Sequence, residues 1–540
     1  MSMKLFDTTL RDGTQREGVS LTAEDKARIA RELDALGIHY IEAGFPASNP
    51  KDLEFFEGFD ATELRQAKIV AFTRARRPNG RAEDDPAVTL LPSLSAPVAC
   101  IVAKSWRLHI EKVLRTTPEE NLESIRDTVK YLADAGKEVI FDAEHYFDGF
   151  KDDPDHALSV LRAAAESGAT TLVMCDTNGG TLPTQLKAIV GRTVREFSGF
   201  PNVEIGIHTH NDAGCGVANA LAAVEAGATH VQGTINGVGE RCGNCDLVTT
   251  IANLQLKMGL KVVEDESLAR LTEASNYVAE LMNLTPDGHR PYVGRSAFSH
   301  KGGLHVDGIS KDTRTYEHVA PESVGNARRM PVGELSGKNS IRAKAEELGL
   351  DAGDVNAVLS AMKQKEHDGY HYEAADASFA LLIRRTTGED EPLFELESFR
   401  IISEKQADTE TTVEATIKLF VKGERVISTA EGNGPVNALD NALRQAIGAH
   451  YPEVDEIHLA NYKVRILDEH RATAATTRVL IDSSDGKRMW GAVGVSENII
   501  EASWQALVDG LEYGVNGAKR GRGGTSRIQP PCPPHASDCI

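Results

Sequence analysis

Residues 5–17 read LFDTTLRDGTQRE, a stretch that combines the signature of a buried strand with two charged side chains. The apolar, β-branched run up to Leu10 is typical of a buried strand, and Gly13 permits a turn directly after the charged pair. At the rim of a sheet, the carboxylate of Asp12 can hold a metal ion and the guanidinium of Arg11 can hold a carbonyl or a carboxylate. A salt bridge at the end of a strand explains this stretch equally well, so the choice depends on the rest of the chain.

Seven further apolar segments of the same kind follow, and helical patterns such as residues 118–135 and 155–167 separate most of them. These predicted strands are residues 39–45, 68–74, 97–103, 138–144, 171–177, 204–210 and 230–236. Eight strands that alternate with helices predict an α/β protein built on a (β/α)8 TIM barrel. An open doubly wound sheet is the structural alternative, but eight evenly spaced units within about 240 residues favour closure.

Polar side chains gather at the carboxyl ends of these predicted strands. They are Arg11, Asp12, Glu42, Thr73, Lys104, Glu144, Asp176, Thr177, His208, His210 and Asn236. Active sites of barrel enzymes lie on this face, where the loops that follow the strands supply the catalytic residues. The position of these residues therefore predicts an active site at the mouth of the barrel.

The motif HTHND places His208 and His210 two residues apart, so both imidazole rings face the same side of a strand. Together with Asp12 they would form a face of two histidines and one carboxylate, which suits a divalent ion with open positions for substrate oxygens. A His-x-His pair alone is a weak motif, and its position at the end of a barrel strand strengthens it. Asn211 and Asp212 are interpreted as caps of the next helix, and this is the preferred interpretation of Asp212.

A second cluster, TINGVGERCGNCDL, occupies residues 234–247. Its glycines let the backbone turn sharply near a ligand, and Glu240 and Asn244 can reach such a site. Cys242 and Cys245 form a single CxxC motif, but no second pair accompanies it. A plain loop is therefore favoured over zinc binding or thioredoxin-like chemistry.

The composition of the 540 residues is that of a soluble globular protein, with 41% hydrophobic and 26% charged residues. A formal net charge of -21 argues against nucleic acid and anionic membranes as partners. Seven cysteines over this length form no secreted disulfide framework. The first residues contain no apolar signal core, and no apolar run is long enough to span a membrane, so we expect a cytoplasmic protein.

The change in pattern along the chain predicts four regions. Residues 1–280 form the barrel, and residues 281–386, in which the strand-helix rhythm fades into segments that contain Gly and Pro, form a connecting subdomain. Residues 387–515 form a third region, which begins at an acidic linker. Residues 516–540 are poor in apolar residues and rich in Gly, Pro and Arg, so we expect a disordered tail.

The third region contains an approximate internal repeat, in which residues 394–446 parallel residues 458–511. Each half is predicted to contain three strands followed by a helix. Two βββα units imply a pseudo-symmetric α+β domain whose helix N-termini and Gly-rich loops can hold a small anion or an amino acid. The alternative is a module that serves only for dimerisation.

The motifs LFDTTLRDGTQ, HTHND and GTINGVGERCGN resemble, in this order, the metal-dependent Claisen condensation enzymes that include isopropylmalate, homocitrate and citramalate synthases. Further segments resemble the long bacterial members that use pyruvate as the 2-oxo acid. They are SNPKDLEFF, KSWRLHIEKVLRTTPEEN, FDAEHYFDGFK, CDTNGGTLP and SAFSHKGGLHVDG. The resemblance covers roughly residues 4 to 515.

This resemblance implies an acyltransferase that joins acetyl-CoA to a 2-oxo acid and converts the acetyl group to an alkyl group on transfer. It implies a divalent metal, Mg or Mn before Zn, held by Asp12, His208 and His210 with Asn244 close by. The metal would act as a Lewis acid on the ketone. Arg11 would bind the substrate and stabilise the developing alkoxide.

The other site residues are also carried over from the family. Thr177 matches the position that binds the substrate carboxylate, and Glu144 matches the active-site glutamate. His305, aided by Tyr316, matches the group assigned to the catalytic base or its relay. Which of Glu144 and His305 removes the proton is left open. In this family the connecting subdomain covers the barrel of the partner subunit, so a homodimer is expected in which His305 acts across subunits.

The resemblance also implies regulation and leaves substrate alternatives. Isoleucine is the expected inhibitor, acting through the repeated domain. One departure, Ala43 and Phe45 where the family pattern has Gly and Trp, favours 2-oxoisovalerate as the alternative acceptor and hence an isopropylmalate synthase.

Related metal-dependent lyases lack the repeated domain, and a non-enzymatic ligand sensor would not need intact metal ligands. A basic cluster is the candidate CoA phosphate site, with a solvated loop as its alternative; it consists of Arg74, Arg76, Arg77 and Arg81.

Overall fold

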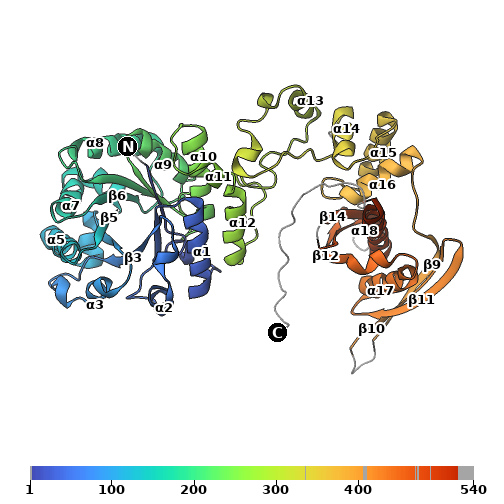
Figure 1. Cartoon of the computed structure of the whole chain (residues 1–540), viewed down its shortest axis with the longest axis horizontal. Coiled ribbons are helices and arrows are strands. Elements are labelled where there is room, and N and C mark those ends of the chain that lie inside the picture. The colour runs from blue at the N-terminus through green and yellow to red at the C-terminus, as the bar shows by residue number, and fades with distance from the viewer. Residues whose placement is uncertain are drawn as a thin grey trace. The chain divides into compact units, whose positions relative to one another are not determined.

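The computed structural model describes residues 3–520, apart from residues 335, 406–409, 469, 471–473 and 487. The chain forms two compact units (Figure 1). The first contains Met1–Phe298 and His318–Arg328, and the second contains Ser299–Glu317 and Arg329–Ile540. Among the described residues, no helix combines the length and apolar character that crossing a membrane would require.

The first unit is a closed barrel of eight parallel strands in chain order, which confirms the predicted TIM barrel and excludes the open sheet. Its strands are β1 (Lys4–Asp7), β2 (Tyr40–Gly44), β3 (Lys68–Arg74), β4 (Val98–Lys104), β5 (Glu138–Glu144), β6 (Thr171–Asp176), β7 (Glu204–Thr209) and β8 (His230–Gly233). The first and the last strand close the barrel, because Leu5 of β1 pairs with Val231 of β8.

Two of these strands end three residues earlier than predicted. Strand β1 ends at Asp7 rather than at Leu10, because the Asp7 carboxylate accepts hydrogen bonds from the backbone N–H and the hydroxyl of Thr9 and turns the chain. Strand β8 ends at Gly233. After it, the backbone N–H of Thr234 bonds to the carbonyl of Cys245 in the following loop, outside the sheet.

Helices cover the outside of the barrel. They are α1 (Ala23–Leu36), α2 (Pro50–Gly58), α3 (Pro86–Thr89), α4 (Arg107–His109), α5 (Pro118–Asp134), α6 (Tyr146–Asp152), α7 (Pro154–Glu166), α8 (Pro183–Glu196), α9 (Gly216–Glu225), α10 (Leu247–Leu256), α11 (Asp265–Leu268) and α12 (Leu271–Leu281). The ends of α1 follow from its sequence. Thr22 and Asp25 form a capping box, and Gly37 ends the helix with a left-handed φ of 102°.

Alternation along the strands separates two cores. Side chains such as Leu5, Ile41 and Val231 point outward and pack against the helices. Side chains at adjacent positions of the strands, such as Phe6 and Tyr40, point inward and fill the barrel. The period of two in a strand therefore decides which residues reach the interior and, at its carboxyl end, the mouth.

The second unit begins with helices α13 (Gly303–Lys311), α14 (Lys338–Glu347), α15 (Val355–His367) and α16 (Asp376–Thr387). Two βββα units follow, as the internal repeat predicted. The first consists of β9 (Glu395–Glu404), β10 (Thr412–Val421), β11 (Glu424–Gly432) and α17 (Pro435–Gly448), and the second of β12 (His458–Ile466), β13 (Thr477–Ser484), β14 (Met489–Ser496) and α18 (Ile499–Arg520). Helix α18 continues into the predicted tail, and residues 521–540 lie outside the described residues.

Candidate active site

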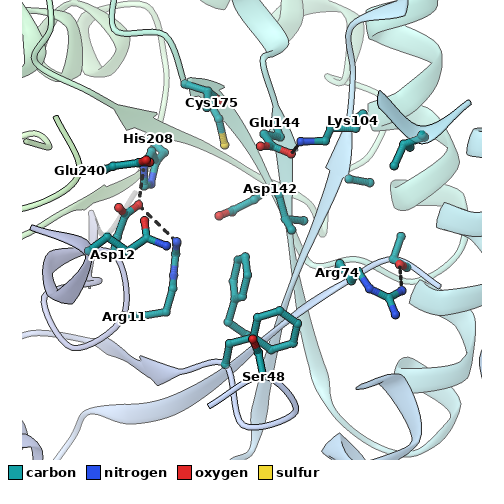
Figure 2. A pocket seen from close by; sticks show the side chains of 18 of the residues that line it. Arg11, Asp12, Ser48, Arg74, Lys104, Asp142, Glu144, Cys175, His208 and Glu240 are labelled. Atoms are coloured by element: carbon teal, nitrogen blue, oxygen red, sulfur yellow. Dashed lines mark hydrogen bonds and ion pairs between the residues drawn. The ribbon is translucent and has the colours of Figure 1, made fainter. Parts of the chain in front are cut away.

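A cavity of about 790 Å³ opens at the carboxyl ends of the barrel strands (Figure 2). Its wall contains polar side chains that were predicted from their positions at the ends of strands or, for Glu240, in the Gly-rich loop. They are Arg11, Asp12, Lys104, Glu144, Thr177, His208, His210 and Glu240. The barrel therefore brings residues from the first, fourth, fifth, sixth and seventh strands, and from the loop after the eighth, to one site.

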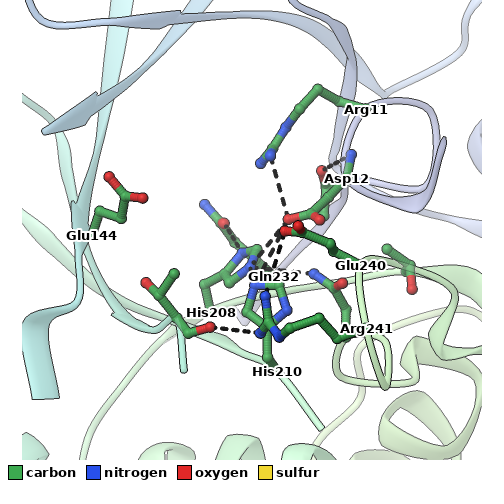
Figure 3. Close-up of polar contacts among 12 residues, drawn as sticks. Arg11, Asp12, Glu144, His208, His210, Gln232, Glu240 and Arg241 are labelled. Carbon is green, nitrogen blue, oxygen red and sulfur yellow. Dashed lines mark hydrogen bonds and ion pairs between the residues drawn. The ribbon is translucent and has the colours of Figure 1, made fainter. Parts of the chain in front are cut away.

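Asp12, His208 and His210 form a group whose candidate ligand atoms all lie within 4.8 Å of one another. The Nε2 atom of His208 lies 3.5 Å from Asp12 Oδ2 and 3.2 Å from His210 Nε2. The Nε2 atom of His210 lies 4.0 Å from the same carboxylate oxygen. All three side chains are buried and converge on one point (Figure 3).

Asn244 completes this group. An isolated bridge pairs it with His210, and its Nδ2 atom lies 3.3 Å from His208 Nε2. Among the described residues, the buried atoms Asp12 Oδ1 and Asn244 Oδ1 have no hydrogen-bond partner. Buried oxygens without partners are costly, and a divalent cation would satisfy them. The donor set of imidazole nitrogens and oxygens fits Mg, Mn or Zn.

The electrostatics favour a cation at this point. Burial by itself would raise the pKa of the Asp12 carboxyl, but Arg11 and the two histidines outweigh it and hold this pKa below its usual value. Burial and the neighbouring His208 lower the pKa of His210 to about 4. At neutral pH the carboxylate is therefore charged and the His210 ring is neutral, the forms that bind a metal.

Arg11 is held in place from two sides. Its Nε atom lies 2.7 Å from Glu42 Oε2, and its guanidinium carbon lies 4.2 Å from the centre of the Phe72 ring. Thr8 donates a hydrogen bond to the same oxygen of Glu42 at 2.5 Å. Another guanidinium nitrogen, Nη1, lies 3.3 Å from Asp12 Oδ2. The geometry presents a fixed positive group beside the candidate metal site.

Glu144 and Thr177 line the same cavity as Asp12. Glu144 forms an ion pair with Lys104, which the parallel register of β4 and β5 places directly beside it. The Thr177 hydroxyl accepts a hydrogen bond from the backbone N–H of His145 at 2.9 Å. A carboxylate, an ammonium and a hydroxyl thus face the same space as the candidate metal ligands.

His305 and Tyr316 belong to the second unit, in and after α13. Their rings stack with centroids 4.0 Å apart, and the Tyr316 side chain is exposed. Their contribution to the barrel site stays a prediction.

The structure corrects the interpretation of Asp212 as a helix cap. Asp212 pairs with Arg241 at 2.8 Å, and α9 begins only at Gly216. Asn211 does meet this helix, because its side-chain oxygen accepts a hydrogen bond from the backbone N–H of Gly216. Asn236 has a structural role, since it bonds to Ser275 in α12.

The basic cluster is largely neutralised within the unit. Arg74 pairs with Asp85, and Arg76 pairs with both Glu120 and Asp127. Arg74, Arg76 and Arg77 nevertheless line the cavity. A role in binding CoA phosphates stays a prediction for these residues, and Arg81 instead pairs with Glu83.

The residues that sequence reasoning missed include four on the barrel strands that line or support this site. Phe72, Asp142 and Cys175 line the cavity, and Gln232 bonds to the metal-ligand candidate His208. A signal was present, because each lies an even number of residues from another inward-facing residue of its strand. Sequence reasoning singled out polar residues near the carboxyl ends of the predicted strands, and these four were not among them.

The model of the HMGL-like family matches residues 2–278, slightly more than half of the chain. The chain belongs to the HMGL-like family. Two further models match later parts of the chain: homocitrate synthase post-HMGL domain-like at residues 292–369, and LeuA allosteric (dimerisation) domain at residues 373–515. The family therefore accounts for the barrel, and the other two models match most of the chain that follows it.

Relatives of this family member match over nearly the full length. An (R)-citramalate synthase of Synechocystis is 49% identical over 527 residues, which cover 95% of this chain and 96% of the relative. One of Aquifex aeolicus is 48% identical, over 94% of this chain and 97% of the relative. A 2-isopropylmalate synthase of Shouchella clausii is 32% identical, over 94% and 95%. The chain is thus much more similar to these two (R)-citramalate synthases than to this 2-isopropylmalate synthase.

Proposed function

We propose that this protein is an (R)-citramalate synthase, which condenses acetyl-CoA with pyruvate and water to give (R)-citramalate and CoA. The observation that carries this proposal is the 49% identity with an (R)-citramalate synthase over 95% of the chain. The convergence of Asp12, His208 and His210 at the mouth of the barrel supports it. The condensation needs a polarised ketone and a base near the acetyl methyl group, and the cavity offers groups for both.

Asp12, His208, His210 and Asn244 would hold the divalent cation, which supplies Lewis-acid chemistry to the ketone and carboxylate oxygens of the 2-oxo acid when bound. The guanidinium of Arg11 would stabilise the negative charge that develops on the ketone oxygen. Glu42 and Phe72 hold this guanidinium before the substrate arrives, so little reorganisation would be needed.

The carbon–carbon bond forms when the acetyl methyl carbon, after losing a proton, attacks C2 of the 2-oxo acid. The ketone oxygen then takes up a proton, and water cleaves the thioester to release CoA. Glu144 lies in the cavity wall and is a candidate acceptor for the methyl proton. His305, with Tyr316, is the other candidate. Thr177 would bind the substrate carboxylate through its hydroxyl.

A 2-isopropylmalate synthase that uses 2-oxoisovalerate is the second candidate. The departure at Ala43 and Phe45 favours it, and Phe45 lies in the cavity wall with its ring edge-on to Phe72 at 5.5 Å. The lower identity of 32% with a 2-isopropylmalate synthase weighs against it. The two candidates share the proposed metal site and differ only in the acceptor.

We further propose that the repeated domain makes the protein an allosteric homodimer that isoleucine inhibits, in a cytoplasmic route to isoleucine. The match to the LeuA allosteric (dimerisation) domain supports regulation and dimerisation in general. Sensitivity to isoleucine would be compared between the full chain and a chain that ends near residue 390. Loss of inhibition with retained activity would support the proposal, and unchanged sensitivity would refute it.

The decisive experiment measures release of free thiol from acetyl-CoA by the purified protein. Pyruvate, 2-oxoisovalerate and 2-oxoglutarate would each be tested as the acceptor, with and without a chelator. Chelator-sensitive release that is greatest with pyruvate would establish the proposal. A preference for 2-oxoisovalerate would establish the second candidate, and no release with any acceptor would refute both.

A further inference from the structure

Three buried side chains from three strands form a hydrogen-bonded chain beneath the candidate metal site. The Nδ1 atom of His208, on β7, lies 2.8 Å from Oε1 of Gln232, on β8. Gln232 Nε2 donates to Asp142 Oδ1, on β5, at 3.0 Å. All three side chains are buried, and Figure 3 shows the contact between His208 and Gln232 below Asp12. The chain crosses the barrel interior and ends on a candidate metal ligand.

The chemistry of the three groups sets a direction for this chain. An ionised carboxylate only accepts hydrogen bonds, so Asp142 requires the NH2 group of Gln232 to face it. The amide oxygen of Gln232 then faces His208 and accepts a hydrogen bond from Nδ1–H. The proton of a neutral imidazole therefore resides on Nδ1, and the lone pair resides on Nε2.

That lone pair faces the candidate metal site. His208 Nε2 lies 3.5 Å from Asp12 Oδ2 and 3.2 Å from His210 Nε2. His210 differs, because its Nδ1 atom is buried and has no hydrogen-bond partner among the described residues. The barrel thus supplies an orienting partner for one histidine of the pair and not for the other.

We propose that Gln232 and Asp142 are positioning residues that fix the tautomer and the ring orientation of His208, so that its Nε2 atom is ready to bind a divalent cation. Neither residue belongs to the group of candidate metal ligands. Because Asp142 accepts a hydrogen bond from the NH2 group of Gln232, the oxygen of the same amide is left to accept one from His208. This inference rests on the proposed metal site and is independent of which 2-oxo acid the protein uses.

The test measures the affinity of the full-length protein for Mn²⁺, by electron paramagnetic resonance of the free ion. Gln232→Leu removes the acceptor for His208 Nδ1–H, and we expect the dissociation constant to rise about 10- to 100-fold, as is usual for partners of metal-bound histidines. Asp142→Asn lets the Gln232 amide turn around and is expected to weaken binding similarly. Circular dichroism would confirm that each variant is folded.

A double variant, which combines Gln232→Glu with Asp142→Asn, separates hydrogen-bond direction from packing. The amide introduced on β5 would donate to the carboxylate introduced on β8, and that carboxylate would accept from His208, so the direction of the chain is restored at nearly constant volume. We expect its affinity for Mn²⁺ to return to within about threefold of the parent protein. This residual loss is smaller than the loss of about tenfold or more that is expected when one of these hydrogen bonds is broken. Recovery in the double variant is an outcome that a purely structural role would not produce.

The matched control is Asp176→Asn. Asp176 is another buried carboxylate in the barrel, beside the amide of Asn219, but it bonds to Thr181 instead of to a metal-ligand partner. Its substitution should leave the affinity for Mn²⁺ unchanged. Unchanged affinity in Gln232→Leu, or a double variant as weak as Asp142→Asn, would overturn the inference. Absence of Mn²⁺ binding by the parent protein would overturn both this inference and the proposed metal site, whereas a change of preferred 2-oxo acid would affect only the proposed function.

Discussion

Buried histidines occupy both ends of the same barrel, and their surroundings differ completely. At the mouth, His208 and His210 face Asp12 and make polar contacts. Near the opposite end, His230 packs against Phe6 and Tyr40 with ring centroids 5.4 and 5.6 Å away. Among the described residues, neither ring nitrogen of His230 has a hydrogen-bond partner.

This comparison shows that burial alone does not make a histidine functional. Burial, followed by the charges of His39 and Lys4, lowers the pKa of His230 to about 3, so this ring is neutral and acts as an aromatic core residue. At the mouth, a buried carboxylate lies within 4.0 Å of both imidazole rings. The mouth therefore gathers the candidate ligands for a cation, while the opposite end contributes to stability, as is general for such barrels.

The largest expected effect comes from removing a candidate metal ligand at the mouth of the barrel. His208→Ala should lower kcat/KM by on the order of 10⁴-fold, because Lewis-acid catalysis supplies several kcal/mol. Metal content by elemental analysis should fall with it. His230→Phe is the control at the other end and should retain activity and metal at neutral pH. Equal losses in both variants would show that the two histidines are not functionally different.

A smaller loss is expected at the far wall of the cavity. Glu144→Gln should lower kcat by about 10³-fold if Glu144 accepts the methyl proton, since general bases contribute 10²- to 10⁴-fold. Metal content should be unchanged, because Glu144 is not a candidate ligand. Exchange of the acetyl methyl protons with deuterium from the solvent is the direct measurement. Full activity in Glu144→Gln and its loss in His305→Ala would assign the base to His305.

Arg11→Lys tests the fixed guanidinium. Lysine keeps the charge but lacks the planar guanidinium that stacks on Phe72 while it pairs with Glu42, so the charge would lie in a less defined position. We expect kcat to fall by about 10²-fold, as for the loss of one oxyanion donor. Activity at the parent level in Arg11→Lys would mean that charge alone matters here.

The smallest expected effect concerns stability at the opposite end. The pKa of His230 is about 3 in the folded protein and about 6.5 in an unfolded chain, so the unfolded state binds an extra proton as the pH falls below about 6.5. This extra proton lowers the free energy of unfolding by about 2 kcal/mol at pH 5, and the effect disappears at pH 8. His230→Phe lacks this group. The difference in free energy of unfolding between His230→Phe and the parent should therefore be about 2 kcal/mol more favourable to the variant at pH 5 than at pH 8.

Urea unfolding of the barrel at both pH values measures this gain. A matched substitution on the outer face of the same strand, Val231→Ile, carries no titrating group and should change stability equally at pH 5 and pH 8. If His230→Phe shifted stability by the same amount at both values, the ring would have to titrate normally, and the contrast between the two ends would be lost.

Much of this molecule follows from local patterns. The alternation of apolar strands with amphipathic helices predicted the closed barrel, and the offset between residues 394–446 and 458–511 predicted two βββα units. The spacing of His208 and His210 placed both rings on one side of a strand, and their Nε2 atoms lie 3.2 Å apart. These predictions succeed because the period of a strand or a helix depends on neighbouring residues only.

Predictions that depended on a distant partner were incomplete. Asp212 was expected to cap a helix, but Arg241 lies beside it and pairs with it. The basic side chains of Arg74 and Arg76 were expected either to meet phosphates or to be solvated, and the structure adds that they pair with carboxylates of their own unit. The nearest partner of a charge depends on which loops closure brings together, and no local pattern contains that information.

The sequence by itself determined the fold class, the face of the barrel that carries the site and the identity of the candidate metal ligands. Only the tertiary structure decided how those ligands are held. Gln232 and Asp142 are 90 residues apart and meet because β5 and β8 both line one closed barrel. Hydrogen bonds of this kind form across the barrel interior, and the direction of each depends on its neighbours in three dimensions.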